Sequence, residues 1–447
     1  METFFTKDKN FYKVFFRLML VVALQNLVAY SVNMLDNMML GSYDQNALSG
    51  AATVNQIFFV VNQLAIAIGN ALIVMSSQYW GKKDTYAIRK LTGIVLIFSL
   101  LAAMIILAIC SAFPEQLLGL FTTSPDIIME GQTYLKILKW TFVLFLISNL
   151  LISMLRSVET VQISFIVSVI SLIVNGGINY TLIFGHFGFP EMGIKGAALA
   201  TVLATVVQFL WSVGYVLCRI RAVKFSLRSC EKKLFGRFWQ KAVPLLINNL
   251  AWGIGFSMYS VIMGHLGTDA VAANGIANIS KNLVVCFCLG LGNAGSIIVG
   301  NRLGADRLQE AKEAGGTLTR TAIIAGIVSG LVLIALSPFI TKMVDLTPTA
   351  RGYLQKMLLI CSYYIAGKSV NCMTIGGIFA AGGDSKFGML CDSVTLWCIT
   401  VPLGCICAFI LKLPVMVVYF VLNLDEIIKL PVVYRHYKKY KWIKNLT

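Results

Sequence analysis

Long apolar runs are the feature that most constrains how this chain can fold. Charged residues make up only 13% of the 447 residues and apolar residues 57%, whereas a soluble domain carries about 25% charged residues. Runs near or above the ~20 residues that a helix needs to cross a bilayer recur along the whole sequence. We place twelve of them at residues 14–40, 47–79, 91–113, 132–155, 162–184, 194–218, 238–264, 271–300, 314–340, 352–381, 387–411 and 413–434. The sequence therefore predicts an all-α integral membrane protein.

Basic residues in the gaps predict the direction of each helix. Of the 37 Lys and Arg residues, 27 fall in alternate gaps and both tails, and only seven fall in the opposite gaps. The basic segments are the N-terminal tail, residues 80–90, Arg156, residues 219–241, residues 302–312, Lys386 and the tail from Lys429. Positive charge favours the cytoplasmic side, so we expect both termini in the cytoplasm. The net charge of +17 follows from this pattern and does not indicate nucleic acid.

Enzymatic and metal-binding signatures are missing from the sequence. The eleven cysteines include no CxxC pair, and no glycine-rich phosphate-binding loop is present. The histidines, His186, His265 and His436, fall in predicted loops or the tail. We therefore expect neither an enzyme nor an organic cofactor.

An internal repeat divides the chain. Residues 25–93 align without gaps on residues 248–316, with matched pairs that include Asn26/Asn249, Asn55/Asn278 and Gly81/Gly304. We predict two six-helix lobes, residues 1–218 and 238–447, joined by a basic cytoplasmic linker at 219–237. Because six is even, both lobes should share one orientation, related by a pseudo-two-fold axis along the membrane normal. That arrangement places a central cavity between the lobes, where transporters bind substrate.

Three motifs are specific enough to compare with a known family. They are Asn33-Met34-Leu35-Asp36 with Gly41 and Ala47, Arg156–Thr160 with its counterpart Ala380–Asp384, and the stretch Asn175–Thr201. Together they resemble the multidrug and toxic compound extrusion (MATE) family of cation-coupled exporters. The resemblance runs from about residue 15 to the C-terminus. It implies a membrane exporter of small organic, amphipathic or cationic compounds in exchange for H⁺ or Na⁺, in a bacterial inner membrane and functional as a monomer.

The chain departs from the family pattern in several places. Val21 stands at the position of a proline that often bends helix 1, whereas its repeat mate Pro244 is kept. We align the family's Gly-Asp pair with Val158-Glu159. Only Trp252 lies near the helix-7 position where some branches carry a glutamate.

Asp36 is the strongest candidate for the coupling residue. A charged group at the bilayer centre costs roughly 2.5–3.5 kcal/mol, so such residues are candidates for function. Gln25, eleven positions earlier, lies about 20° away around the helix, so both side chains could face the lobe interior. Withdrawal from water favours the protonated carboxyl group, so Asp36 could exchange a proton, or hold Na⁺ with neutral oxygens. The resemblance implies that Asn175, Asn179 and Thr201 supply these neutral oxygens. A purely structural, hydrogen-bonded Asp36 is the alternative.

Several charges fall in the second half. Lys368 could pair with Asp392 or line the cavity, and Lys281 could line the cavity or reach toward a helix end. Asp425 and Glu426 lie near Lys429, where we expect an interfacial ion pair. Other candidates for the substrate cavity are Asn55, Gln56, Met258, Asn278 and Asn371, although hydrogen bonding between helices and core packing explain most such residues.

Two rivals to the exporter follow from the same sequence. A lipid-linked oligosaccharide flippase of the related superfamily often has extra helices and several cavity arginines, which this sequence lacks. A membrane enzyme or structural subunit is disfavoured by the duplication and by the lack of a catalytic pattern.

Overall fold

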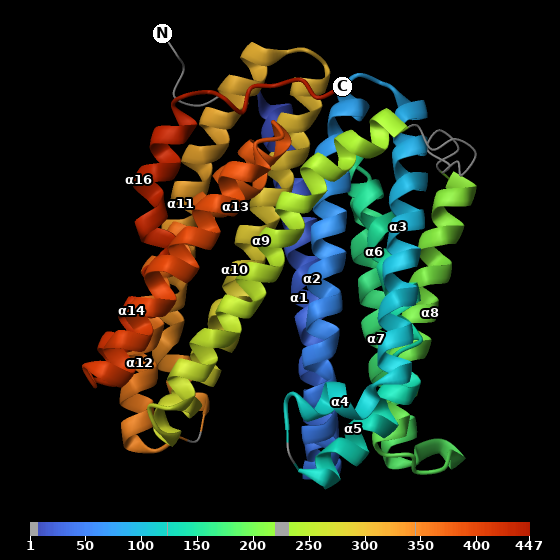
Figure 1. Cartoon of the computed structure of the whole chain (residues 1–447), viewed down its shortest axis with the longest axis vertical. Coiled ribbons are helices and arrows are strands. Elements are labelled where there is room, and N and C mark those ends of the chain that lie inside the picture. The colour runs from blue at the N-terminus through green and yellow to red at the C-terminus, as the bar shows by residue number, and fades with distance from the viewer. Residues whose placement is uncertain (1–7, 123, 220–231, 345) are drawn as a thin grey trace. The chain divides into compact units, whose positions relative to one another are not determined.

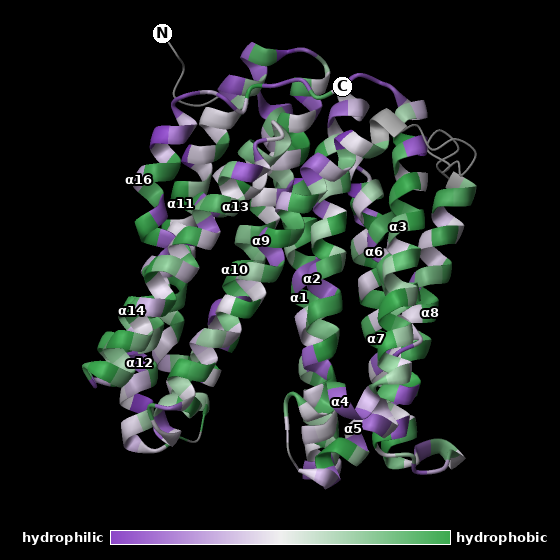
Figure 2. Cartoon of the chain, in the orientation of Figure 1, coloured by the Kyte–Doolittle hydropathy of each residue, from purple (hydrophilic) through white to green (hydrophobic). Residues whose placement is uncertain are grey.

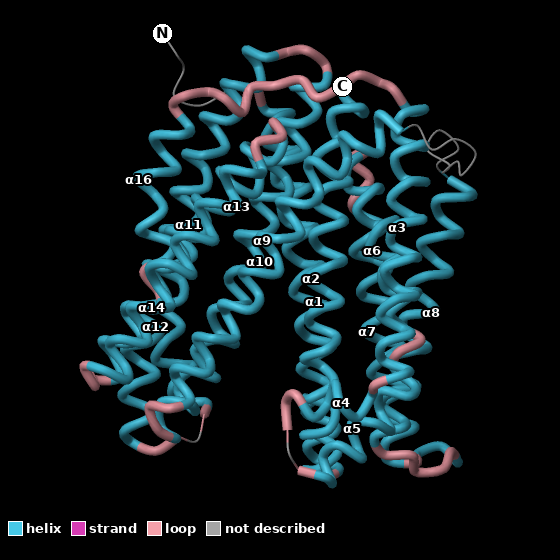
Figure 3. Tube along the Cα trace, in the orientation of Figure 1, coloured by secondary structure: helices cyan, strands magenta, loops and turns pink. Residues whose placement is uncertain are grey.

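The computed structural model describes residues 8–122, 124–219, 232–344 and 346–447. Within these ranges every regular element is a helix, and short loops join the helices (Figures 1 and 3). The α-helices are α1 (Lys9–Tyr43), α2 (Gln45–Gly81), α3 (Thr85–Ala112), α4 (Pro114–Gly119), α5 (Pro125–Leu138), α6 (Thr141–Ser157), α7 (Gln162–Phe184), α8 (Ile194–Arg219), α9 (Lys232–Gly264), α10 (Thr268–Gly304), α11 (Leu308–Met343), α12 (Pro348–Asn371), α13 (Ser385–Ser393), α14 (Val401–Cys405), α15 (Val415–Leu422) and α16 (Asp425–Tyr437). The 3₁₀ turn η1 (His186–Gly188) and the π-helical segments η3 (Cys372–Phe379), η4 (Val394–Thr400) and η5 (Ile406–Ile410) complete the set.

Most predicted spans correspond to one long helix. In the described ranges, nine helical stretches are long and apolar enough to cross a membrane, and the bent pair α5–α6 makes a tenth. The two remaining predicted spans are less regular. Residues 352–381 form α12 and then the π-helix η3, and residues 413–434 form α15 and α16 with a break at Asn423.

The surfaces of the long helices are suited to lipid. On α11 the side chains of Ile323, Ile324, Ile327, Val328 and Leu331 are all 44% exposed or more. Figure 2 shows hydrophobic residues along most of the length of the helices. Because exposed apolar surface of this extent is unfavourable in water, these helices require a lipid environment.

Helix ends repeat between the two halves of the sequence. Beyond the end of α2, Lys83 has φ 62°, and its repeat mate Asp306, beyond the end of α10, has φ 60°. The backbone N–H of Lys83 donates to the Trp80 carbonyl at 2.9 Å, and that of Asp306 donates to the Leu303 carbonyl at 3.1 Å. A left-handed residue with this bond is a common way to end a helix. The duplication inferred from the sequence therefore extends to positions where the residues differ.

The second repeated helix end corrects the motif alignment. Glu159, after α6, has φ 61°, and Gly383, after η3, has φ 73°. Glu159 donates to the Arg156 carbonyl at 3.0 Å, and Gly383 donates to the Ala380 carbonyl at 2.8 Å. The motif's glycine therefore corresponds to Glu159, and its placement at Val158 was wrong by one residue.

A close helix crossing joins the ends of α2 and α10. A Cβ atom added to Gly81 would overlap the Asn301 carbonyl oxygen, and one added to Gly304 would overlap the Gln78 carbonyl oxygen. Gln78 and Asn301 are themselves repeat mates, as are Gly81 and Gly304. Equivalent turns of the two repeats thus cross each other, and only glycine leaves space for the facing backbone.

The described chain forms two compact units. One contains the described residues up to Ala23 together with Ser77–Lys83 and Val243–Thr447, and the other contains Leu24–Ser76 and the described residues of Asp84–Ala242. The beginning of α1 and the end of α2 thus pack with the second half of the sequence. Most of the predicted linker, residues 220–231, lies outside the described residues, so the predicted domain boundaries stay a prediction.

Candidate functional site

A buried hydrogen-bond chain surrounds Asp36 in the unit that contains α7 and α8. Asn175 and Asn179 are one turn apart on α7, so they share a helix face. Asn179 Nδ2 donates to Asp36 Oδ1 and also to Asn175 Oδ1, the latter at 3.1 Å. Asn175 Nδ2 reaches Thr201 Oγ1 on α8 at 3.5 Å. Three helices therefore bring together four of the five residues that the sequence and the family resemblance assigned to one site.

Three of the four residues in this group are buried, and Thr201 is half-buried. The exposed fraction is 8% for Asp36, 1% for Asn175 and 0% for Asn179. Asn179 Oδ1 is buried and has no hydrogen-bond partner among the described residues. A buried unpaired acceptor is costly, and here it lies on the residue that contacts a carboxylate. Small hard cations prefer oxygen ligands, so these oxygens could bind either a proton or such a cation.

Sequence reasoning missed Tyr134 on α5. It is 3% exposed, and its hydroxyl interacts with Thr201 and lies within electrostatic range of Asp36. Its place in an amphipathic helix is typical of core packing, so no sequence signal distinguished it.

Gln25 belongs to a different contact. Its Oε1 accepts a hydrogen bond from Arg156 Nη2 at 2.6 Å. Gln25 and Asp36 share a direction around α1, but eleven residues separate them by about 16 Å along the helix axis. The structure therefore places Gln25 beside Arg156 and outside the Asp36 group.

Lys368 and Asp392 lie in the other unit and are not paired with each other. Lys368 Nζ contacts Glu426 Oε1 on α16 at 2.9 Å and lies 5.0 Å from the centre of the Trp252 ring. Asn371, one turn after Lys368 on α12, donates to Glu426 Oε2 at 2.8 Å. Of the two alternatives for Lys368, pairing with Asp392 is wrong, because Lys368 pairs with Glu426.

Lys429 is the partner of Asp392 and the centre of a wider network. Its Nζ lies 2.8 Å from Asp392 Oδ1, 3.2 Å from Glu426 Oε2 and 3.9 Å from Asp425 Oδ2. Asn248 Nδ2 on α9 donates to Asp392 Oδ2 at 3.0 Å. Glu426, Asp425 and Lys429 are 0%, 3% and 4% exposed. The pairing expected at Lys429 exists, and it is buried between helices.

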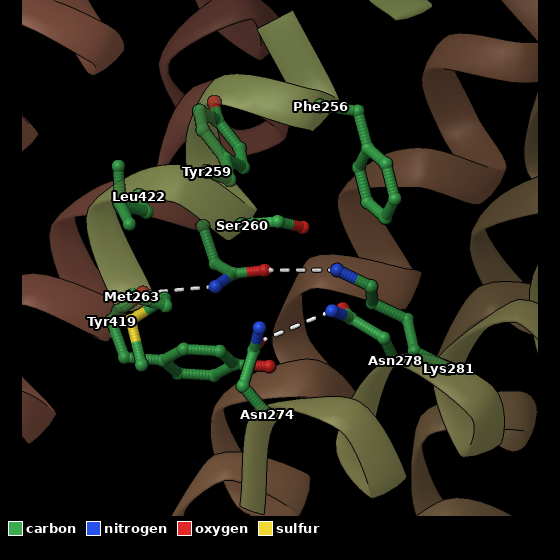
Figure 4. A pocket seen from close by; sticks show the side chains of 10 residues that line it. Phe256, Tyr259, Ser260, Met263, Asn274, Asn278, Lys281, Tyr419 and Leu422 are labelled. Atoms are coloured by element: carbon green, nitrogen blue, oxygen red, sulfur yellow. Dashed lines mark hydrogen bonds between the residues drawn. The ribbon is translucent and has the colours of Figure 1, made fainter. Parts of the chain in front are cut away.

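A small cavity lies in the same unit. It is lined by Phe256, Tyr259, Ser260, Met263, Asn274, Asn278, Lys281, Tyr419, Leu422 and Asn423 (Figure 4). Its volume of about 10 Å³ is enough for the centre of roughly one water molecule. Of the predicted substrate-cavity residues, Asn278 lines this cavity. Three other predicted residues, Met258, Asn55 and Gln56, do not line the cavity. Met258 on α9 and Asn55 on α2 are half-buried, and Gln56 on α2 is exposed.

Comparison with known proteins decides the family. The family model described as MatE matches residues 22–181 and 244–406, which cover both halves of the duplicated sequence. The chain belongs to the MatE family. The chain is also similar to a probable multidrug resistance protein YoeA of Bacillus subtilis, 26% identical over 440 residues, which cover 96% of this chain and 93% of that protein.

Other relatives agree with this assignment. A probable multidrug resistance protein NorM of Rhizobium meliloti is 27% identical over 303 residues, which cover 64% of this chain but only 62% of that protein. Among solved structures, a MATE transporter of Vibrio cholerae, VcmN, matches with a TM-score of 0.89 over 98% of both chains at 16% identity. The chain is thus a member of a multidrug efflux transporter family, and its predicted fold of twelve transmembrane helices is confirmed.

Proposed function

We propose that this chain exports small organic compounds, amphipathic or cationic, in exchange for H⁺ or Na⁺ by alternating access. The observation that carries the proposal is the buried carboxyl group of Asp36, held by the amide of Asn179 beside the unpartnered Asn179 Oδ1. Proton or Na⁺ binding at this group is the coupling event, with Asn175, Asn179 and Thr201 as supporting oxygens and amides.

The neutral surroundings of Asp36 support a change of charge. No ion pair to Asp36 occurs within the described residues, so gain or loss of a proton or Na⁺ breaks no contact with a lysine or arginine. A buried charge in a low-dielectric site interacts strongly with its neighbours. Each change in the charge of Asp36 therefore alters the balance of forces between α1, α7 and α8.

Energy for export comes from the cation gradient. One positive charge crossing 100 mV supplies about 2.3 kcal/mol. Coupling requires that cation and exported compound bind the two conformations unequally, since a ligand with equal affinity for both shifts nothing. We infer that cation binding at Asp36 favours the conformation that binds the exported compound weakly.

The location and assembly belong to the same proposal. Basic residues concentrate in alternate gaps, which supports cytoplasmic termini in a bacterial inner membrane. Helices α1, α7 and α8 of one chain supply all four residues of the Asp36 group, so the proposed coupling site needs no residue of a second subunit, in keeping with a functional monomer whose one bound cofactor is the coupling ion.

The test is gradient-driven flux in liposomes that contain the purified protein. A panel of fluorescent organic cations is loaded, and the proton and sodium gradients are collapsed separately with selective ionophores. We expect transport that stops when one of the two gradients is removed. Absence of gradient-dependent flux for the whole panel, relative to protein-free liposomes, would contradict the proposal.

A further inference from the structure

Lys281 on α10 is a buried cation with little direct compensation. Its exposed fraction is 3%. The side chain carries three N–H donors, and the one hydrogen bond seen in the described residues is a long one of 3.4 Å to Asn423 Oδ1. The rings of Tyr364 and Phe256 lie 4.7 and 5.4 Å from its nitrogen. Aromatic faces attract a cation, but they do not use its N–H donors.

The acids nearest to Lys281 are committed to other lysines. Asp425 and Glu426 lie within electrostatic range of Lys281, as does Lys368, yet no carboxylate in the described ranges makes an ion pair with it. Glu426 contacts both Lys368 and Lys429. Asp425 lies near Lys429, and Asp392 contacts that lysine directly. The three carboxylates are therefore held by two lysines, and the third lysine is left without an acid in contact.

Polar groups converge on the free side of Lys281. Figure 4 shows the side chains of Ser260 and Asn278 directed toward the same space as the Lys281 ammonium. Asn278 Nδ2 gives one hydrogen bond to Asn274 Oδ1 at 3.2 Å, and its second N–H remains available. Ser260 is exposed and lines the cavity, so the space can be reached from outside the core.

We propose that Lys281 is the receptor of a binding site for one small monoanionic group. The ammonium supplies the charge, Ser260 and Asn278 supply neutral donors, and the aromatic rings exclude water from the other sides. Charge-assisted hydrogen bonds of this kind are the strong ones. A cavity of about 10 Å³ limits the ligand to a single small ion or to the leading group of a larger compound.

Two sources can supply this chemistry, a free halide or the carboxylate of an exported compound. The second source rests on the proposed export function, and the first does not. Both predict that binding depends on Lys281 and on a negative charge in the ligand.

The test is equilibrium binding to the purified full chain in detergent, with ³⁶Cl⁻ and ¹⁴C-benzoate as separate probes in gluconate buffer. We expect saturable binding of at least one probe, no competition by the neutral analogue benzamide, and at least a tenfold loss in Lys281→Met. Lys342→Met removes an exposed lysine of the same unit and should bind as the wild type does. Chloride binding alone identifies a halide site, and benzoate binding identifies a carboxylate site.

A second variant, Ser260→Ala, tests the site even if Lys281→Met fails to fold. Ser260→Ala changes an exposed residue and should weaken binding several-fold without unfolding the protein. Absence of saturable binding of both probes to the wild type, or wild-type affinity in Lys281→Met or Ser260→Ala, would overturn the proposal. Because no gradient is present, failure of this test leaves gradient-driven export untouched, and failure of export leaves the anion site untouched.

Discussion

Two buried carboxylates of this protein have opposite kinds of partner. Asp36 is held by the amide of Asn179, whereas Glu426 contacts the ammonium groups of Lys368 and Lys429 at 2.9 and 3.2 Å. Two adjacent cations favour the ionised form of an acid, and a neutral donor favours it far less. Glu426 is therefore a fixed charge of the fold, while the charge of Asp36 can change without breaking an ion pair.

Removal of one partner of the buried network should be costly. In Lys368→Met, Glu426 loses its closest cation while it stays 0% exposed. A buried charge left without any partner costs about 3 kcal/mol or more. Lys429 still contacts Glu426 in this variant and offsets part of that cost, so we expect a smaller but clear fall in the thermal unfolding midpoint in detergent. Lys356→Met, at an exposed position of the same helix, is the matched control. An unchanged midpoint in Lys368→Met would show that the network adds nothing to stability.

Relief of backbone strain at Lys83 should raise the thermal unfolding midpoint. Its φ of 62° costs a residue with a Cβ atom about 1 kcal/mol, a cost that glycine avoids. Lys83→Gly should therefore raise the unfolding midpoint. Lys82→Gly changes an exposed neighbour outside the left-handed positions and should lower the midpoint. A shift of both midpoints in the same direction would show that the left-handed conformation of Lys83 carries no strain that glycine relieves.

At the scale of helices, the crossing of α2 and α10 depends on glycines. Gly304→Ala places a Cβ against the Gln78 carbonyl oxygen, and relief requires movement of a whole helix. Overpacking of this kind costs up to about 3 kcal/mol. We expect less folded protein after purification, measured as the monodisperse fraction in size-exclusion chromatography.

Gly264→Ala is the control for this substitution. A Cβ at Gly264, near the end of α9, meets nothing within 4 Å, so this variant should purify like the wild type. Equal yields for Gly304→Ala and Gly264→Ala would mean that the helices can separate at the crossing without cost.

The sequence predicted helices better than interruptions within them. Twelve apolar runs located the helices because the thickness of lipid fixes their length. The same runs concealed the break at Asn423, because residues 413–422 and 427–434 are apolar enough to read as one span with an ion pair at its edge. The break carries Asn423 against Lys281 and puts Glu426 beside Lys368. Contacts of this kind depend on how helices pack, which periodicity does not encode.

At the scale of the whole molecule, the duplication of the fold does not extend to the chemistry of the sites. The expected burial of a charge in helix 1 located Asp36, the family resemblance located Asn175, Asn179 and Thr201, and the structure brings all four together. The repeat mate of Asp36 is Tyr259, so the equivalent turn in the second half lacks a carboxylate. The buried carboxylates of the second half lie on other helices, Asp392 on α13 and Asp425 and Glu426 on α16. Sequence spacing could not assign their lysine partners.

The duplicated halves therefore carry different chemistry on one fold. The unit that contains Asp36 offers a carboxyl group bound by a neutral amide, and the unit that contains Lys281 offers a charged network beside one buried lysine that makes no ion pair within the described residues. In the proposed export cycle, this division lets the coupling cation and the exported compound bind at distinct sites that influence each other.

The most direct test of this account is gradient-driven accumulation by Asp36→Asn in liposomes. The substitution keeps the size of the side chain and removes its ability to change charge. Asp126→Asn, at an exposed residue in the first turn of α5, is the matched control. The account predicts that Asp36→Asn folds and reconstitutes normally but loses at least tenfold in accumulation, while Asp126→Asn transports as the wild type does. Wild-type accumulation by Asp36→Asn would contradict the central role of this carboxyl group.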